Sequence, residues 1–461
     1  MQVLIFGTGK YYQKYKKFFF EHEIVGFLDN DPLQQGTCLD GVHIFSPKAG
    51  LKMHYDCIYV LMPNTQSVIK QLLDYGVAKT YIRGVSDLLS LKPCLSSPCI
   101  YSSTPLSEHA NKHVLLISHD LSYTGAPLAL AALGRILFIK GYQVSFASPT
   151  DNRQFRQSLV QEGMSVIIDE TLRCGRLRDF PWVRGFDFIG VNTVVLCPLL
   201  AEWTGDCPVF WWIHEVREAY KAIDISTLKS LGENARRIFP YAVSFRAKRY
   251  FLEQYQQGGV NELLYGLPDD TLPCKPEGDA KVVFALIGTV AYRKGLDLFL
   301  DAITLFLHRG HTDVLFWIIG DYENTAWGRD IYRKASTIPQ VVFWGGLPHE
   351  EVVKLFPRIT AVVVPSRDET MSIAANEAMM HSVGCIVSED TGVAPYVEKE
   401  HAGIVCPTED TDCWVTAMEW VIKNPKQWEE FGVHGRATYE KYFSMKVFEK
   451  NVDKMLRKIR Q

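Results

Sequence analysis

Two glutamates, Glu369 and Glu377, stand eight positions apart within residues 365–392, which read PSRDETMSIAANEAMMHSVGCIVSEDTG. The apolar run AVVVP at residues 361–365 predicts a buried parallel strand, and the Ala-rich part that ends at His381 predicts the helix that follows. Glu369 then lies in the loop between strand and helix, and Glu377 lies about two turns into the helix. Because carboxylate oxygens accept hydrogen bonds, the two side chains could bind the hydroxyl groups of a sugar.

The first turn of this helix predicts an anion site. Its backbone N–H groups, near residues 371–374, have no partner inside the helix, and the helix dipole places positive charge there. We assign this site to Thr370, Met371, Ser372 and Ile373. A nucleotide sugar carries both the phosphates that such a helix tip binds and the hydroxyls that the glutamates would bind. Glutamates at this spacing also occur by chance on solvated helix faces, so the spacing alone does not establish the site.

The same segment closely resembles the signature of a large family of retaining glycosyltransferases with the GT-B fold, family four in the usual classification of sugar enzymes. The residues that carry the resemblance are Pro365, Ser366, Glu369, Glu377, Ala378, Met379, the strand CIVSE, Thr391 and Gly392. The resemblance implies an α/β protein of GT-B architecture, in which two Rossmann-like domains face each other. It further implies that Glu369 positions the donor sugar in catalysis and that Glu377 binds the ribose hydroxyls.

Residues suited to phosphate binding follow another apolar run, VVFALI. The next residues, GTVAYRKG, include Gly288, Thr289, Arg293 and Lys294. In doubly wound sheets ligands bind at the carboxyl ends of the strands, so these two cations could neutralise a diphosphate. The resemblance implies that Lys294 binds the leaving diphosphate and acts in catalysis. Many family members carry Arg directly after the first glycine, where this chain has Thr289, and Arg293 could supply the missing charge.

Other strand ends carry further candidates. The motif TGAP resembles the glycine-rich loop with which the family approaches the donor phosphate and the acceptor, and only small residues permit so close an approach. A lone histidine after an apolar run such as WWI is more often structural, whereas the resemblance implies that it reaches the donor sugar or the acceptor in catalysis. The motifs IIGDYE and WGGLP resemble strand ends that line the pocket for the base. The residues concerned are Gly125, Ala126, His214, Gly320, Gly346 and Leu347.

Composition narrows the choice of function. The chain has 461 residues, 47% apolar content and a formal charge of −3, which allow two or three packed domains and argue against nucleic acid as a partner. The 11 cysteines are scattered without a C-x-x-C pair, which predicts free thiols in a reducing compartment. Neither a signal peptide nor an apolar run near the ~20 residues of a membrane span is visible, so we predict a cytoplasmic protein.

Alternating strands and helices predict parallel sheets that are covered by helices on both faces. We expect a Rossmann-like N-terminal domain (1–90), a Ser- and Pro-rich linker (91–112), an N-terminal, acceptor-side GT-B domain (113–272), a C-terminal, donor-binding GT-B domain (273–440) and a C-terminal helix (441–461). The resemblance covers about residues 113–461. It implies that the last helix crosses back to the N-terminal GT-B half.

The N-terminal segment carries an incomplete dinucleotide fingerprint. Gly7 and Gly9 match two glycines of G-x-G-x-x-G, Tyr12 replaces the third, and Asp29 follows the second strand, where a ribose-binding acid could lie. The pieces FGTGK and GFLDND resemble the small domains at the front of sugar-modifying acyltransferases and other polysaccharide-assembly proteins. Two roles stay open, nucleotide binding and docking of a partner protein. The stretch KYYQKYKKFFF fits either peripheral contact with an anionic membrane or a helix with one basic and one packed face.

Taken together, the residues and the resemblance predict a retaining glycosyltransferase of the hexosyltransferase type. Its donor would be a UDP- or GDP-sugar and its acceptor a glycan or a lipid-linked sugar, in polysaccharide or glycoconjugate biosynthesis. The family's reaction implies no metal or other cofactor, and the Asp-x-Asp match DND at residues 29–31 lies outside the GT-B segments. Two alternatives stay open. One is a catalytically silent GT-B partner that binds glycan, which Thr289 supports, and the other is an NAD-dependent sugar-modifying enzyme that uses the N-terminal domain.

Overall fold

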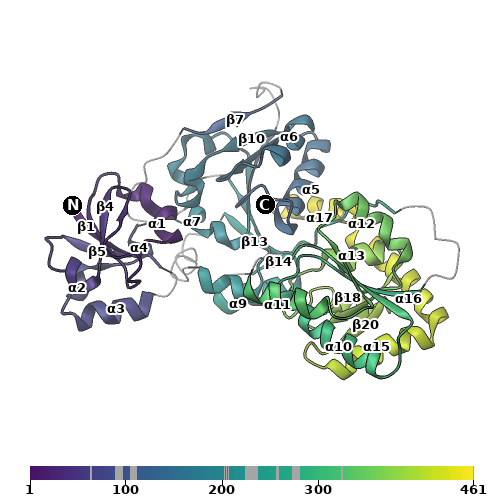
Figure 1. The fold of residues 1–461 in the computed structure, drawn as a ribbon. Helices are drawn as coiled ribbons and strands as arrows, with labels where there is room; N and C mark the ends of the chain where they lie inside the picture. Colours follow the sequence, from purple (N-terminus) through teal and green to yellow (C-terminus); the bar gives the residue numbers. More distant parts are fainter. Residues whose placement is uncertain are drawn as a thin grey trace. The chain divides into compact units, whose positions relative to one another are not determined.

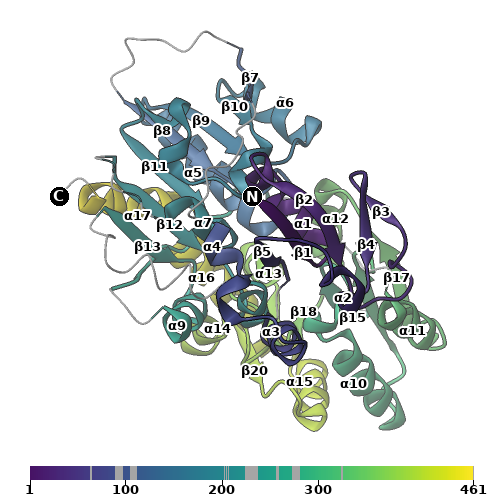
Figure 2. The same ribbon diagram turned by 90° about the vertical axis from the view of Figure 1, so that its left-hand side faces the viewer.

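The computed structural model describes residues 1–62, 65–88, 97–103, 112–201, 203, 205, 207–223, 237–255, 259–271, 281–322 and 325–459 (Figures 1 and 2). The chain forms two compact units. The first comprises residues 1–241 and 251–260, and the second comprises residues 242–250 and 261–459. Within the described residues, three sheets of mainly parallel strands carry an α/β fold, as predicted. The predicted boundaries of the five segments stay predictions.

The first sheet is built from the N-terminal residues and has the strand order β3-β4-β2-β1-β5-β6. Its strands are β1 (Gln2–Phe6), β2 (Glu23–Leu28), β3 (Cys38–Leu39), β4 (Val42–Phe45), β5 (Cys57–Val60) and β6 (Ile82–Arg83). The helical segments around it are α1 (Lys10–Tyr15), η1 (Lys16–Phe19), α2 (Pro47–Gly50), α3 (Thr65–Asp74), η2 (Lys79–Tyr81) and α4 (Val85–Leu88). Alternate residues of β1 point to opposite faces, so Val3 and Ile5 enter one apolar cluster while Leu4 and Phe6 enter another.

The Lys- and aromatic-rich stretch after β1 forms α1 and η1. Tyr12, Tyr15, Phe18 and Phe19 are buried in the apolar cluster of the first sheet, whereas Phe20 is exposed. This arrangement fits a helix with one basic and one packed face, and it removes most of the aromatic surface that membrane contact would use. Within the described residues, no helix combines the length and apolar character that crossing a bilayer requires.

The second sheet has the strand order β14-β13-β12-β11-β8-β9-β10-β7, and its strands from β13 to β7 are described first. Its strands are β7 (Cys99–Tyr101), β8 (His113–Ile117), β9 (Gln143–Ser148), β10 (Ser165–Ile168), β11 (Phe188–Asn192), β12 (Val209–Ile213) and β13 (Ile238–Ala242). The helical segments are α5 (Gly125–Ile139), α6 (Arg153–Gln161), η3 (Glu170–Arg173), η4 (Leu177–Asp179), η5 (Pro181–Val183), η6 (Val194–Leu196), α7 (Cys197–Leu200) and η7 (Arg217–Ala222). β7 lies inside the predicted linker and pairs antiparallel with β10, an edge strand that the sequence pattern did not reveal.

The largely apolar run YAVSF, residues 241–245, favours a strand by residue type, but only its first two residues lie in one. β13 ends at Ala242, and α9 (Phe245–Gln254) begins three residues later. The hydroxyl of Ser244 accepts a hydrogen bond from the backbone N–H of Ala247 at 3.2 Å, so this serine caps the helix. Capping by a side chain therefore outweighs the strand preference of the neighbouring valine and phenylalanine.

The third sheet belongs to the second unit and has the order β17-β16-β15-β18-β19-β20, with every pair parallel. Its strands are β15 (Val282–Ile287), β16 (Val314–Ile319), β17 (Val341–Gly345), β18 (Ala361–Val364), β19 (Gly384–Ser388) and β20 (Gly403–Cys406); β14 (Asn261–Glu262) precedes them in the chain. The helical segments are η8 (Tyr292–Lys294), α10 (Leu296–His308), α11 (Ala326–Ala335), α12 (His349–Leu355), η9 (Phe356–Arg358), α13 (Ile373–Met380), α14 (Ala394–Lys399), α15 (Thr411–Lys423), α16 (Pro425–Thr438), η10 (Tyr439–Phe443) and α17 (Met445–Ile459). The apolar face of α10 packs with α15 in one buried core (Figure 1).

The strand orders create the same feature in each sheet. In the third sheet β15 pairs with β16 on one side and with β18 on the other. The chain therefore adds strands first on one side of β15 and then on the other side. β8 has the same place between β9 and β11, and β1 between β2 and β5. The loops at the carboxyl ends of the strands diverge at such a switch point and leave room for a ligand. The fold therefore directs attention to the carboxyl edge of each sheet.

Gly295 allows two loops of the third sheet to approach each other. It has a φ of +71°, and a Cβ atom added there would lie 1.9 Å from the carbonyl oxygen of Pro365. A side chain at this position would therefore push the loop after β15 away from the loop after β18.

Replacing Gly295 by alanine should destabilise the second unit more than the same change at Gly310. Both glycines have positive φ, but Gly310 has open space around its missing Cβ atom. We expect Gly310→Ala to lose about 1–2 kcal/mol, the cost of left-handed backbone, and Gly295→Ala to lose more than about 3 kcal/mol. Urea unfolding followed by tryptophan fluorescence measures both losses. Equal losses would show that the two loops do not depend on close contact at Gly295.

Candidate active site

The predicted site residues of the second unit gather at the carboxyl edge of the third sheet. Lys294 follows β15 and Glu369 follows β18, the strands that flank the switch point. Lys294 Nζ lies 2.5 Å from Glu369 Oε1, and the hydroxyl of Ser366 donates to Glu369 Oε2 at 2.8 Å. The side chains of Lys294 and Glu369 are only 18% and 10% exposed. Opposite charges are thus held in contact where the chain connections diverge.

Arg367 fastens the loop after β18 to the loop after β15. Its guanidinium donates two hydrogen bonds of 2.8 Å to the carboxylate of Asp297 in α10, and another to the carbonyl oxygen of Tyr292. The backbone N–H of Arg367 donates to the carbonyl oxygen of Arg293 at 2.8 Å. Because these bonds are made on both sides of Lys294 in the chain, they fix the backbone that carries it. Neither Arg367 nor Asp297 is a predicted site residue, although each lies within three residues of one.

The helix α13 begins where the sequence predicted it. Ser372 is the N-cap residue, and its hydroxyl accepts a hydrogen bond from the N–H of Ala375 at 3.3 Å. This bond occupies one N–H of the first turn, and the N–H of the half-buried Ile373 has no acceptor within the helix itself. Thr370 and Met371 lie buried just before the cap. The first turn of α13 therefore still has backbone N–H donors for an anion, although the side chain of Ser372 caps the helix.

Glu377 lies on the second turn of α13 and is 9% exposed. Burial raises the pKa of its carboxyl to about 7, while the nearby His349 acts to lower it and Asp270 to raise it. Tyr265 lies near both predicted glutamates: burial raises the pKa of its phenol, and the charges of Glu369 and Glu377 raise it further. The structure thus brings the two acids to the same buried phenol. Tyr265, His349 and Asp270 lie outside the motifs of the sequence and were not predicted.

The loops after β15, β16 and β17 lie against one another. A Cβ atom on Gly320, which has a φ of +145°, would lie 2.2 Å from the carbonyl oxygen of Gly288. The N–H of Gly346 donates to Asp321 Oδ1 at 2.8 Å, and Leu347 is half-buried in the same loop. These contacts bring together the residues predicted to line a pocket for the base. Asp321 is an acid at this edge that the sequence analysis did not assign.

Thr289 and Arg293 present exposed side chains at the same edge. Lys294 already neutralises Glu369, whereas the guanidinium of Arg293 forms no hydrogen bond or ion pair with any other described residue. Its full charge is therefore open to an anionic ligand. This fits the prediction that Arg293 compensates for the threonine at 289.

In the first unit, Gly125 and Ala126 begin α5, as the glycine-rich motif predicted. The side-chain amide of Asn192, at the end of β11, donates to the carbonyl oxygen of Ala126 at 2.9 Å. This bond joins the two sides of the switch point of the second sheet. The amide oxygen of Asn192, the hydroxyl of Ser118 and Nδ1 of His119 are buried without a hydrogen-bond partner among the described residues. Buried polar atoms normally have partners, so these atoms are suited to polar groups of a ligand.

His214 follows β12 and packs on Trp212, with 4.8 Å between ring centroids. Burial, assisted by the nearby His119, lowers the pKa of His214 to about 3, so its ring is neutral. The carboxylate of Glu215 accepts hydrogen bonds from the backbone N–H groups of Val194 and His214, at 2.8 and 2.9 Å, yet burial raises its pKa to about 7. A neutral imidazole both donates and accepts, which suits a hydroxyl ligand better than a charged one.

The acid predicted for ribose binding in the first sheet is engaged by its own loop. Asp29 accepts hydrogen bonds from the hydroxyl of Thr8 at 2.6 Å and from the N–H of Asp31 at 3.0 Å. Gly7 has a φ of +106°, and a Cβ atom there would lie 2.7 Å from the carbonyl oxygen of Leu61. Gly7 therefore serves close packing of its own sheet. Nucleotide binding by this sheet stays a prediction.

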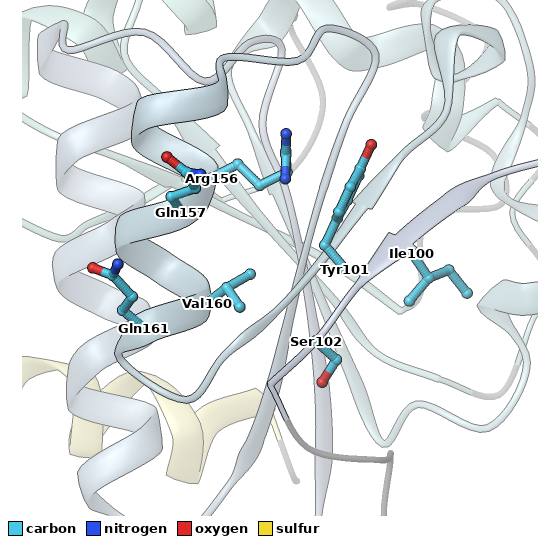
Figure 3. Close-up of a pocket in the computed structure, with 7 residues that line it drawn as sticks. All are labelled: Ile100, Tyr101, Ser102, Arg156, Gln157, Val160 and Gln161. Atoms are coloured by element: carbon cyan, nitrogen blue, oxygen red, sulfur yellow. The ribbon is translucent and has the colours of Figure 1, made fainter.

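A pocket of about 440 Å³ lies between β7 and α6 and contains none of the predicted site residues (Figure 3). The guanidinium of Arg156 lies over the ring of Tyr101, 3.7 Å from its centroid, and pairs with Asp151 at 2.8 Å. This cation is therefore already engaged by an aromatic face and a carboxylate. We assign no function to the pocket.

Solved structures establish the class of fold. Sucrose-phosphate synthase from Thermosynechococcus elongatus superposes with a TM-score of 0.62 at 16% identity, over 76% of this chain and 99% of that one. Anabaena HepE in complex with UDP superposes with a TM-score of 0.63 at 14% identity, over 75% of this chain and 100% of that one. Such low identities show the fold alone. The protein is an α/β protein of the GT-B class, as the sequence analysis predicted.

Protein families identify the domains within that fold. Residues 274–438 match the family described as glycosyl transferases group 1, and residues 110–244 match glycosyl-transferase family 4. Residues 1–83 match the C2185-like N-terminal family. Two consecutive parts of the chain are therefore similar to glycosyltransferase families, and the part before them is similar to a different family.

Curated relatives carry the names of sugar-transferring enzymes. D-rhamnosyltransferase WbpZ of Pseudomonas aeruginosa is 30% identical over 207 residues, which are 42% of this chain and 51% of the relative. O-antigen chain mannosyltransferase C of Escherichia coli is 29% identical over 35% of this chain and 42% of the relative. Glycogen synthase of Mycobacterium tuberculosis is 28% identical over 32% of this chain and 35% of the relative. The chain thus spans about half or less of these relatives.

The buried Glu215 should make the stability of the protein fall as the pH rises. Its pKa is raised from 4.5 to about 7 on folding, so the folded state favours the protonated carboxyl. Stability is lost between these two pH values, by on the order of a few kcal/mol, because ionisation is easier in the unfolded chain. Glu215→Gln lacks this loss, so its melting temperature should rise relative to wild type between about pH 5 and about pH 8.

Glu162, whose pKa is lowered on folding, provides the control. Arg135 lowers the pKa of Glu162 below its ordinary value of 4.5, so Glu162→Gln should lose stability relative to wild type as the pH rises up to about 4.5, and that difference should then stay nearly constant between about pH 5 and about pH 8. A Glu215→Gln variant that follows the wild-type curve would contradict the buried, protonated state of this acid.

Proposed function

We propose that this protein is a retaining glycosyltransferase of the hexosyltransferase type, which moves a sugar from a nucleotide-diphosphate sugar to a glycan or lipid-linked acceptor. The observation that carries the proposal is the contact between Lys294 and Glu369 across the switch point of the third sheet. The two residues are 75 positions apart in the chain, and the fold places their opposite charges together. A donor of this class offers a diphosphate to the cation and hydroxyls to the acid.

The leaving diphosphate binds among positive groups. Lys294 and the exposed Arg293 provide side-chain cations, and the first turn of α13 adds N–H donors and the positive end of the helix dipole. Negative charge develops on the diphosphate as it departs, and fixed cations lower the energy of that transition state without having to reorganise. No metal ion or other cofactor is needed in this scheme, because the side chains supply the charge.

Glu369 positions the sugar of the donor. Lys294 and Ser366 hold its carboxylate before any ligand arrives, so the acid is ordered in advance. An ionised carboxylate accepts hydrogen bonds from sugar hydroxyls and stabilises the positive charge that develops on the sugar ring. Glu377 binds the ribose hydroxyls, and the base lies against the loops that carry Gly320 and Gly346.

The transfer exchanges one bond at the anomeric carbon for another on the same face. The bond to the diphosphate oxygen breaks, and a bond to the hydroxyl oxygen of the acceptor forms. The proton of that hydroxyl passes to the leaving diphosphate oxygen, so atoms and charge balance and the anomeric configuration is retained. Glu369 takes no proton in this scheme, because both of its oxygens already accept hydrogen bonds.

The first unit supplies groups for the acceptor. Gly125 and Ala126 permit close approach of the backbone, and the neutral ring of His214 can exchange hydrogen bonds with a hydroxyl of the acceptor or the donor sugar. The relative named O-antigen chain mannosyltransferase C supports a glycan acceptor, and the UDP complex of HepE supports a UDP-sugar, with a GDP-sugar as the second choice. We place the reaction in the cytoplasm, in keeping with the scattered, free cysteines.

The proposed roles separate in kinetics. Glu369→Gln should lower kcat by about 10²–10³-fold while leaving the affinity for UDP itself unchanged, because the acid contacts the sugar. Lys294→Ala should lower kcat and also weaken UDP binding by about tenfold or more, because a charged hydrogen bond to the diphosphate is lost. Transfer or slow donor hydrolysis with labelled UDP-, GDP- and ADP-sugars measures kcat, and calorimetry measures the UDP affinity.

Lys281 offers a matched control for the loss of a lysine. It precedes β15, at the opposite edge of the same sheet, and forms an exposed pair with Asp313. Lys281→Ala should keep normal rates and UDP affinity. If wild-type protein neither transfers nor hydrolyses any of the three donors, a silent GT-B partner replaces the enzyme as the better description.

A further inference from the structure

The buried Glu377 is the last of four ionisable side chains that contact one another in a row, namely His381, Asp270, His349 and Glu377. His349 begins α12, with its Nε2 2.7 Å from Asp270 Oδ2 and its Nδ1 3.5 Å from Glu377 Oε1. The other oxygen of Asp270 lies 3.1 Å from Nε2 of His381. All four residues belong to the second unit. One imidazole therefore lies between two carboxylates, one of which is the acid assigned to the ribose.

We propose that His349 is a positioning residue, which keeps Glu377 ionised and oriented for the ribose hydroxyls by directing an N–H to each of two carboxylates. A carboxylate only accepts hydrogen bonds. A neutral imidazole has one N–H and can serve one of the two acids, whereas the protonated ring has two and serves both. The inference rests on the proposed function, because it explains how Glu377 is prepared for the donor.

Neither His381 nor Tyr265 carries a positive charge that could take the place of His349 beside the two acids. His381 is buried and stacked on Phe356, with 4.3 Å between ring centroids, and burial lowers its pKa despite Asp270. It therefore serves Asp270 as a neutral donor and adds no charge. The phenol of Tyr265, near Glu377, is uncharged as well. The remaining charged neighbours are the exposed Glu350 beside His349, Glu351 paired with Lys354, and Asp269 paired with Arg436.

The charge of His349 acts to lower the pKa of Glu377. Burial raises the pKa of Glu377 to about 7, and His349 opposes that effect. A carboxyl group that takes up a proton loses one site that accepts hydrogen bonds and gains one that donates. The ribose hydroxyls need Glu377 as an acceptor. Donor affinity should therefore fall as the pH drops through the pKa of Glu377. Without His349 that pKa is higher, so the fall should begin at a higher pH.

His349→Gln tests this direction. The Kd values of UDP and of GDP are measured by calorimetry between about pH 5.5 and about pH 8.5 in wild type and variant. We expect the acid fall in affinity to move up by about one pH unit, which makes binding about tenfold weaker within the fall. A residue with only a structural role would weaken binding equally at all pH values, and that result would overturn the inference.

His311 provides the matched control. It also lies beside a carboxylate, with Nε2 3.3 Å from Glu419 Oε1, but it precedes β16 at the opposite edge of the sheet. His311→Gln should keep the wild-type pH profile. A shift in this variant of the same size as in His349→Gln would show that the effect is not specific to Glu377.

A measurement without nucleotide separates this inference from the proposed function. In protein labelled with ¹⁵N-histidine, the signals that disappear in His349→Gln belong to His349, and both ring nitrogens should carry a proton while Glu377 is ionised. A neutral ring would overturn the bridge between the two acids. If wild type binds neither UDP nor GDP, the proposed donor site is wrong and the positioning role is overturned with it. If wild type binds and His349→Gln keeps its pH profile, the positioning role alone is wrong.

Discussion

The contact between Lys294 and Glu369 depends on the order of strands in the third sheet. The chain goes from β15 to β16 and β17 and then returns to β18 on the other side, so no helix separates the loops after β15 and β18. Gly295 lets these loops touch, and Arg367 bonds them to each other. The ion pair is therefore a consequence of topology, and the loops that hold it could not meet in another strand order.

The same ion pair supplies Glu369 with a partner from within the protein. Removing two charges from water costs free energy that their attraction only partly repays, so a buried pair contributes little to stability by itself. Lys294 and Ser366 nevertheless keep Glu369 from being a lone buried charge. An ammonium group has three donors, so Lys294 can bond a phosphate while it keeps its bond to Glu369. The exposed Arg293 has no such bond to another described side chain, so its charge can serve the ligand.

Local patterns predicted the elements around the two glutamates, because the signals there are short-range. The apolar run became β18, and Ser372 caps α13 as a residue of its type should. The end of β13 does not follow from strand preference, because Ser244 starts a helix among residues that favour strands. The contact of His349 with Asp270 could not be predicted at all. The two residues are 79 positions apart, and neither belongs to a motif, so only the packing of α12 brings them together.

Each of the three sheets has a switch point, but the sheets differ in what lies there. In the first sheet Asp29 is satisfied by Thr8, so its polar groups serve the loop itself. In the second sheet Asn192 retains a buried oxygen without a described partner, next to strand ends that carry a neutral histidine. The third sheet holds cations, acids and a helix tip. Fold alone does not assign function, whereas these differences do. A charged edge suits the diphosphate of a donor, and a neutral polar edge suits the hydroxyls of an acceptor, because an unpartnered polar atom gains a bond from a hydroxyl without having to compensate a charge.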